Sequence, residues 1–168
     1  MKLVEINKAR YRKHLNQVII ACVAALTIGS LGVAQLLIQL FPDVDGSHFH
    51  WNLTGVVVTC IVIGLVLKKH KAHPFMTEVS YVWDLKQSLN KITRKMAKLK
   101  QAAQQGDMDA MTAIQYSYAG SRQLWQLDDN TITMDDLAMW QAELDSLASK
   151  YQVEIKAENY KETMLKQY

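Results

Sequence analysis

Two long apolar runs in the first half of the chain constrain its fold more than any other feature. They extend over residues 18–41 and 49–67, and neither contains a charged residue. A membrane-spanning helix needs about 20 mainly apolar residues, because lipid offers no hydrogen-bond partner to backbone polar groups. The sequence therefore predicts a transmembrane helical hairpin over residues 18–71, with a short outer loop at residues 42–48.

Each run has an alternative reading. The strictly apolar part of the second run, residues 53–67, reaches the length of a span only if Trp51 lies at headgroup level, so a core helix of a soluble domain stays open. The first run could be a cleaved signal peptide with a small-residue site at residues 32–34. We favour a span, because the basic segment and the apolar run are both long for a signal peptide.

Small residues recur at four-residue spacing in both runs and predict close packing of the two helices. They are Ala21, Ala25 and Gly29 in the first run and Cys60 and Gly64 in the second.

Basic residues at the two ends of the predicted hairpin give its orientation. They are Lys8, Arg10, Arg12 and Lys13 before the first run and Lys68, Lys69 and Lys71 after the second. The connection contains Asp43 and Asp45 but no lysine or arginine. The positive-inside rule then predicts a multi-pass protein of a bacterial inner membrane with both termini in the cytoplasm. Residues 1–17 form a basic cytoplasmic segment in this topology.

The net charge of +3 belongs to these flanks. Residues 1–74 hold 8 Lys and Arg against 3 Asp and Glu, whereas residues 75–168 hold 11 against 13. A positive charge confined to the ends of apolar runs indicates contact with membrane lipid, and we expect no nucleic-acid partner.

Residues 75–168 predict a small cytoplasmic helical domain, so the fold class is all-α. Pro74 disfavours helix at the residue before it and suits the first turn of the next helix. Apolar spacing predicts a long helix over residues 76–105, a second over 108–127 capped by Asp107, and a third over about 133–151. Three apolar seams joined by short turns suit an antiparallel bundle. The alternative is that the seam of the long helix pairs with another chain as a coiled coil.

A basic run crosses the long helix without any acidic residue. Its members are Lys86, Lys91, Arg94, Lys95, Lys98 and Lys100. Such a run is most often a solvated face. It could also contact anionic lipid, or it could face the acidic residues Asp128, Asp129, Asp135 and Asp136.

The sequence contains no strong constellation for catalysis or cofactor binding, so we expect neither an enzyme nor a bound cofactor. There is no glycine-rich phosphate loop and no recognisable nucleophile with its base. One group in the predicted outer loop combines carboxylates with imidazoles, which can bind a divalent metal. Its members are Asp43, Asp45, His48 and His50. A polar loop of this composition also occurs without metal.

Three segments resemble a known family. They are residues 6–16, with Asn7-Lys8 and Arg10-Tyr11-Arg12-Lys13-His14, residues 73–83, with His73-Pro74-Phe75, and residues 127–133, with Asp128-Asp129-Asn130. Together they resemble a family of uncharacterised two-span inner-membrane proteins from gammaproteobacteria, a domain of unknown function. The resemblance covers essentially the whole chain and implies the membrane topology. It implies no activity, ligand or catalytic residue.

These observations predict a membrane-anchored helical interaction or scaffold module that binds another protein or itself. Two alternatives follow from the charged groups: an electrostatic membrane-surface module that uses residues 86–100, and a metal-responsive sensor that uses the outer loop.

Overall fold

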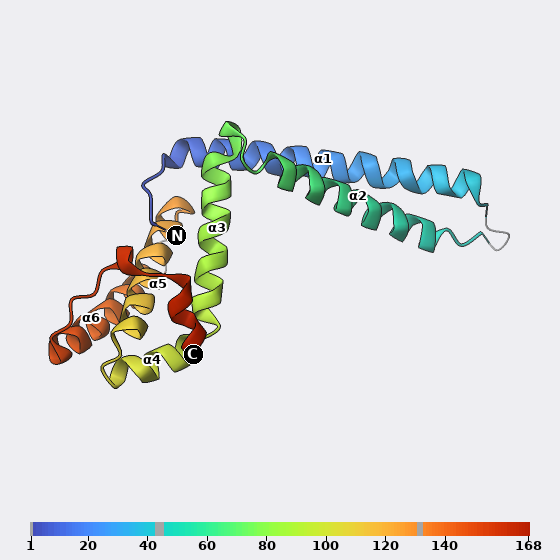
Figure 1. Ribbon diagram of the computed structural model, residues 1–168. Helices are drawn as coiled ribbons and strands as arrows, with labels where there is room; N and C mark the ends of the chain where they lie inside the picture. The colour runs from blue at the N-terminus through green and yellow to red at the C-terminus, as the bar shows by residue number, and fades with distance from the viewer. Residues whose placement is uncertain (1, 43–45, 131–132) are drawn as a thin grey trace. The chain divides into compact units, whose positions relative to one another are not determined.

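The computed structural model describes residues 2–42, 46–130 and 133–168, and every regular element in them is helical, as the sequence predicts (Figure 1). The elements are α1 (Lys8–Leu40), α2 (Phe49–His70), η1 (Pro74–Met76), α3 (Thr77–Thr93), α4 (Met96–Gln104), α5 (Met108–Leu127), α6 (Met134–Tyr151), η2 (Ala157–Asn159) and η3 (Glu162–Gln167).

The chain divides into two compact units. The apolar unit is Ala9–Ser80, and the polar unit combines Met1–Lys8 with Tyr81–Tyr168. The segment before α1 therefore packs with residues that lie far along the chain, and α3 begins in the apolar unit and continues into the polar unit.

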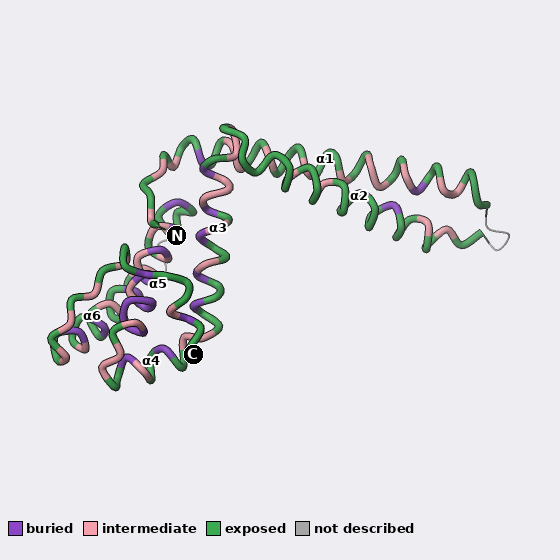
Figure 2. Tube along the Cα trace, viewed as in Figure 1, coloured by how far each residue is buried: buried purple, intermediate pink, exposed green. Residues whose placement is uncertain are grey.

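Helices α1 and α2 are both long and apolar enough to cross a membrane. Only 6% of the apolar window of α1 and 11% of that of α2 is buried within the protein, so these side chains face outward rather than into a core (Figure 2). The 33 residues of α1 extend about 50 Å, against about 30 Å for a hydrocarbon core. Because α1 starts at Lys8, part of the predicted basic segment is helical.

Two glycines allow α1 and α2 to approach closely. A Cβ atom on Gly55 would lie 2.6 Å from the Ser30 carbonyl oxygen, and one on Gly29 would lie 2.7 Å from the Thr59 side chain. The buried Thr59 hydroxyl donates to the Gly55 carbonyl at 2.8 Å, which satisfies it inside the contact. Small residues thus form the contact, as predicted, but not along the predicted stripes. On α1 Gly29 lies in the contact whereas Ala21 and Ala25 are exposed, and on α2 the contact follows the Gly55–Thr59 line.

The predicted stripe on the second run is therefore wrong. Cys60 is exposed, and a Cβ atom on Gly64 would meet nothing within 4 Å. Four-residue spacing occurs on several faces of an apolar helix, and only the partner helix selects one of them.

The predicted single helix over residues 76–105 is also wrong, because the helix is interrupted between α3 and α4. Lys95 has φ −110° and ψ 3°, outside the helical range, and the Thr93 hydroxyl bonds back to the Leu89 carbonyl, which favours a bend. A straight helix of about 30 residues would extend about 45 Å, beyond the roughly 30 Å of α5. The break lets Ile92 on α3 and Leu99 on α4 both be fully buried.

Helix α5 forms the centre of the polar unit, and its bounds match the prediction. It begins at the expected cap, where the Asp107 side chain accepts from the Ala110 amide at 3.0 Å. At Gly120 a Cβ atom would lie 3.0 Å from Leu89, so α3 approaches closely there. One turn earlier, Tyr160 of the C-terminal segment (residues 157–168) stacks on Tyr116 of α5, with ring centroids 4.3 Å apart. Figure 2 shows the buried residues concentrated along α5.

Candidate functional site

The start of α1 and the start of α3 build an ionic cluster within the apolar unit. Arg10 Nε lies 2.9 Å from Glu78 Oε1, and His14 Nδ1 lies 3.5 Å from Glu78 Oε2. The imidazole of His14 also stacks on Phe75, with ring centroids 4.2 Å apart. Two of the segments that carry the family resemblance, residues 10–16 and 73–79, therefore meet here.

This cluster contains a buried carboxylate that needs its partners. Glu78 is 7% exposed, and no hydrogen-bond partner within range is found for its Oε2 atom or for His14 Nδ1 among the described residues. A buried carboxylate is stable only when it is paired. The cluster can fix the first turn of α3 against the start of α1.

The turn before α3 is fixed by its own hydrogen bonds. The Phe75 amide donates to His73 Nδ1 at 3.2 Å, and the Ser80 hydroxyl donates to the Lys71 carbonyl at 2.8 Å. His73 has φ −70° and ψ 140°, the extended backbone expected before Pro74.

In the polar unit, the N-terminal arm (residues 2–7) is held by its main chain. The Val4 amide donates to the Tyr81 hydroxyl at 2.8 Å, and the Val4 carbonyl accepts from Gln123 Nε2 at 2.6 Å. The Tyr81 hydroxyl in turn donates to Gln123 Oε1 at 2.9 Å, which closes a ring of three bonds. Lys8 forms an ion pair with Asp129 beside it. Residues 6–8 and 127–130, two further parts of the resemblance, thus also come together.

The basic run of α3 and α4 makes contacts inside the polar unit. Lys86 pairs with Asp128 at 3.3 Å, one of the arrangements weighed from the sequence. Three lysines hold the C-terminal segment: Lys91 Nζ lies 2.6 Å from Glu162 Oε1, Lys95 Nζ donates to the Leu165 carbonyl at 2.6 Å, and Lys98 Nζ donates to the Tyr168 carbonyl at 2.6 Å. Lys100 Nζ lies 5.8 Å above the Trp140 ring, and Arg94 is exposed. Contact of this run with lipid remains a prediction.

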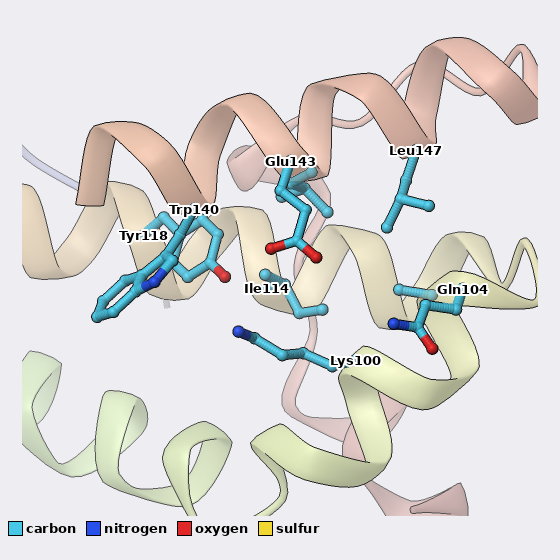
Figure 3. A pocket seen from close by; sticks show the side chains of 9 residues that line it. Lys100, Gln104, Ile114, Tyr118, Trp140, Glu143 and Leu147 are labelled. Carbon is cyan, nitrogen blue, oxygen red and sulfur yellow. The ribbon is translucent and has the colours of Figure 1, made fainter. Parts of the chain in front are cut away.

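A small cavity lies where α4, α5 and α6 meet (Figure 3). Lys100, Tyr118, Trp140 and Glu143 line it, and burial together with the charge of Glu143 raises the pKa of Tyr118. Its volume of about 20 Å³ has room for about one water molecule. The cavity is therefore too small for a substrate.

The metal candidates of the outer loop are only partly described. Asp43 and Asp45 lie outside the described residues, and His48 precedes the first turn of α2. The His50 ring lies tilted against the Trp51 ring, with centroids 4.5 Å apart. In residues 2–42, 46–130 and 133–168 no three metal-ligating side chains gather. The metal hypothesis stays a prediction.

Sequence reasoning missed Glu78 and Gln123. Glu78 resembles an ordinary acidic residue of a first helical turn, and Gln123 lies on a helix surface 119 residues from its partner Val4. Glu78 lies within the resembling segment of residues 73–83, and that position was the available signal for it. The sequence carries no such signal for Gln123.

The comparisons with known proteins agree with the expected family resemblance. No curated protein and no solved structure matches the chain. A family model described as "Protein of unknown function (DUF3087)" matches residues 1–165. The bacterial group and the membrane address that we attached to the resemblance remain predictions. Because the match takes in both compact units and all three resembling segments, the chain belongs to the uncharacterised family DUF3087.

Proposed function

We propose that this protein is a two-span protein of a bacterial inner membrane whose helical polar unit lies on the cytoplasmic side and acts by binding another protein. The observation that carries the topology is the attachment of the N-terminal arm to the polar unit through Val4, Tyr81 and Gln123.

The argument rests on chain order. The arm precedes α1, whereas Tyr81 and Gln123 follow α2. The arm and the polar unit can only touch if the chain returns to the side from which it started, which requires an even number of crossings. Two outward-facing apolar helices supply two crossings. The basic flanks then favour the cytoplasm as the shared side.

The same contact argues against removal of α1 as a signal peptide. Cleavage near residues 32–34 would separate the arm from the polar unit, and the half-buried Leu3 and Ile6 would have no reason to line a hollow together with residues of α5. The arm is part of the packing of the polar unit, and so we expect it to be retained.

Binding of a protein partner is supported by large apolar side chains exposed on the polar unit. Trp83 on α3 is 62% exposed, and Met139 on α6 is 66% exposed, next to Trp140. Tryptophan and methionine are enriched in protein–protein contacts. These exposed side chains, rather than a reactive group, are the property of the unit on which we base its role.

Reporter fusions test the topology. We expect fusions at residue 1 and after residue 168 to report the cytoplasm, and a fusion in the loop at residues 42–48 to report the periplasm. A terminus in the periplasm would refute the proposal.

Crosslinking in native membranes tests the role. A photo-crosslinking residue at Trp83 or Met139 should capture a defined partner, including a second copy, whereas matched positions Gln87 on α3 and Asp136 on α6 should capture less. Equal capture at all four positions, or none, would count against a contact surface here.

A further inference from the structure

Two segments of like charge pack against one another in the polar unit. Residues 91–98 carry four cations, Lys91, Arg94, Lys95 and Lys98, and no carboxylate. The segment that lies on them, residues 160–168, carries Lys161, Glu162 and Lys166, a net charge of +1. Positive groups brought together repel each other unless counter-charges lie between them.

The contacts within this pair leave Lys95 against a neutral group. Lys91 pairs with Glu162 and Lys98 donates to a main-chain oxygen of Tyr168, whereas Lys95 donates to the neutral carbonyl oxygen of Leu165. A carbonyl oxygen replaces hydration of an ammonium group but does not cancel its charge. The segment is held by apolar burial instead, since Tyr160 and Leu165 are each 4% exposed.

A hollow of about 330 Å³ lies between the two segments. Its walls contain three lysines, Lys91 from the last turn of α3, Lys95 from the turn before α4 and Lys166 from η3, together with Glu162, Thr163 and Leu165. Three ammonium groups and a hydroxyl donor against one carboxylate make an environment that favours an anion. Lysine is a compact cation that binds phosphate oxygens as a point charge.

We propose that this hollow binds an anionic phosphate group, whether of a phospholipid headgroup or of a soluble phosphate compound. The bound anion supplies the counter-charge that the two segments lack. The proposal needs only the polar unit and does not depend on the topology or the protein partner proposed above.

The test uses the full chain in a neutral detergent, titrated by calorimetry with inorganic phosphate and, separately, with short-chain phosphatidylglycerol below its micellar concentration. Saturable binding of phosphate identifies a site for the free ion, and binding of phosphatidylglycerol alone identifies a lipid-headgroup site. Either supports the proposal. No saturable binding of either probe overturns it.

Variants locate the binding and separate it from a structural effect. Lys166→Gln and Lys95→Gln should each weaken the apparent affinity about tenfold, and Lys150→Gln, an exposed lysine outside the hollow, should leave it unchanged. Glu162→Gln should tighten binding several-fold because it removes the carboxylate of the hollow, although it also loses an ion pair. Unchanged affinity in Lys166→Gln, or weaker binding in Glu162→Gln, would overturn the proposal.

Discussion

Glu78 carries the ionic cluster of the apolar unit. A carboxylate in the first turn of a helix is favoured by the helix dipole, which by itself explains an acidic residue at the start of α3. Its burial adds a requirement, because the carboxylate then depends on the positive charge of Arg10, and the His14 imidazole lies 3.5 Å from its second oxygen.

Replacing Glu78 should therefore destabilise the apolar unit. Glu78→Gln keeps the shape of the side chain but leaves Arg10 and His14 facing a neutral amide, and we expect a loss of about 1–3 kcal/mol. Thermal unfolding followed by tryptophan fluorescence in detergent measures this. Glu154→Gln is the control, since Glu154 is exposed and its ion pair is with the exposed Lys156. A Glu78→Gln midpoint equal to the control would contradict the role of the cluster.

Tyr160 predicts a dependence of stability on alkaline pH. Burial, offset in part by the Ser88 hydroxyl, raises the pKa of Tyr160 to about 12, from an ordinary value of 10.0. A raised pKa contributes stability that is complete below the unfolded value and is lost as pH rises through the folded one. The attachment of the C-terminal segment should therefore weaken between about pH 10 and 12.

Phenolate absorbance near 295 nm, as a difference between the wild type and Tyr160→Phe, measures this titration. The difference should show a transition near pH 12, and Tyr160→Phe should lose less stability than the wild type across this interval. A difference transition close to pH 10 would show that Tyr160 ionises as it does in water.

At the scale of elements, close approach decides which glycines matter. Gly55 and Gly64 both lie within α2, but only Gly55 faces α1. Helix propensity predicts the same effect at both positions: replacing either glycine by alanine should stabilise the helix by up to about 1 kcal/mol, because the unfolded backbone loses less entropy on folding.

Gly55→Ala should nevertheless destabilise the helix pair, because its Cβ atom would collide with the Ser30 carbonyl oxygen. Backbone cannot move aside as a flexible side chain can, so we expect a net loss of about 1–3 kcal/mol. Gly64→Ala is the matched control and should be neutral or stabilising. Thermal unfolding in detergent compares them, and a Gly55→Ala variant as stable as Gly64→Ala would mean that α1 and α2 do not pack as described.

At the scale of the molecule, the arm makes the polar unit discontinuous in sequence. Residues 2–8 contribute to a unit otherwise formed by residues 81–168, and the attachment depends on main-chain hydrogen bonds to Tyr81 and Gln123. Main-chain recognition of this kind is insensitive to the identity of the Val4 side chain, which is exposed.

Gln123→Ala should release the arm without unfolding α5. It removes the donor to the Val4 carbonyl and the acceptor of the Tyr81 hydroxyl, so the Val4 amide should exchange with solvent at least several-fold faster. Hydrogen exchange with mass spectrometry on peptides from residues 2–8 measures the effect. Arg122→Ala, at the neighbouring exposed position of α5, is the control, and unchanged exchange in Gln123→Ala would contradict the attachment.

Local properties of the chain determined its helices. The apolar runs predict α1 and α2, Asp107 predicts the start of α5, and Pro74 predicts where the next helical segment begins after α2. Each of these effects acts within a few residues. The break at Lys95 is favoured locally by the bond from the Thr93 hydroxyl to the Leu89 carbonyl. Tertiary structure decided the choice of Gly55 over Gly64, the partners of Lys91, Lys95 and Lys98, and the burial of Glu78. Each of these depends on a neighbour that lies far along the chain. A periodic sequence pattern shows which residues share one face of a helix, but it does not show which other segment packs on that face.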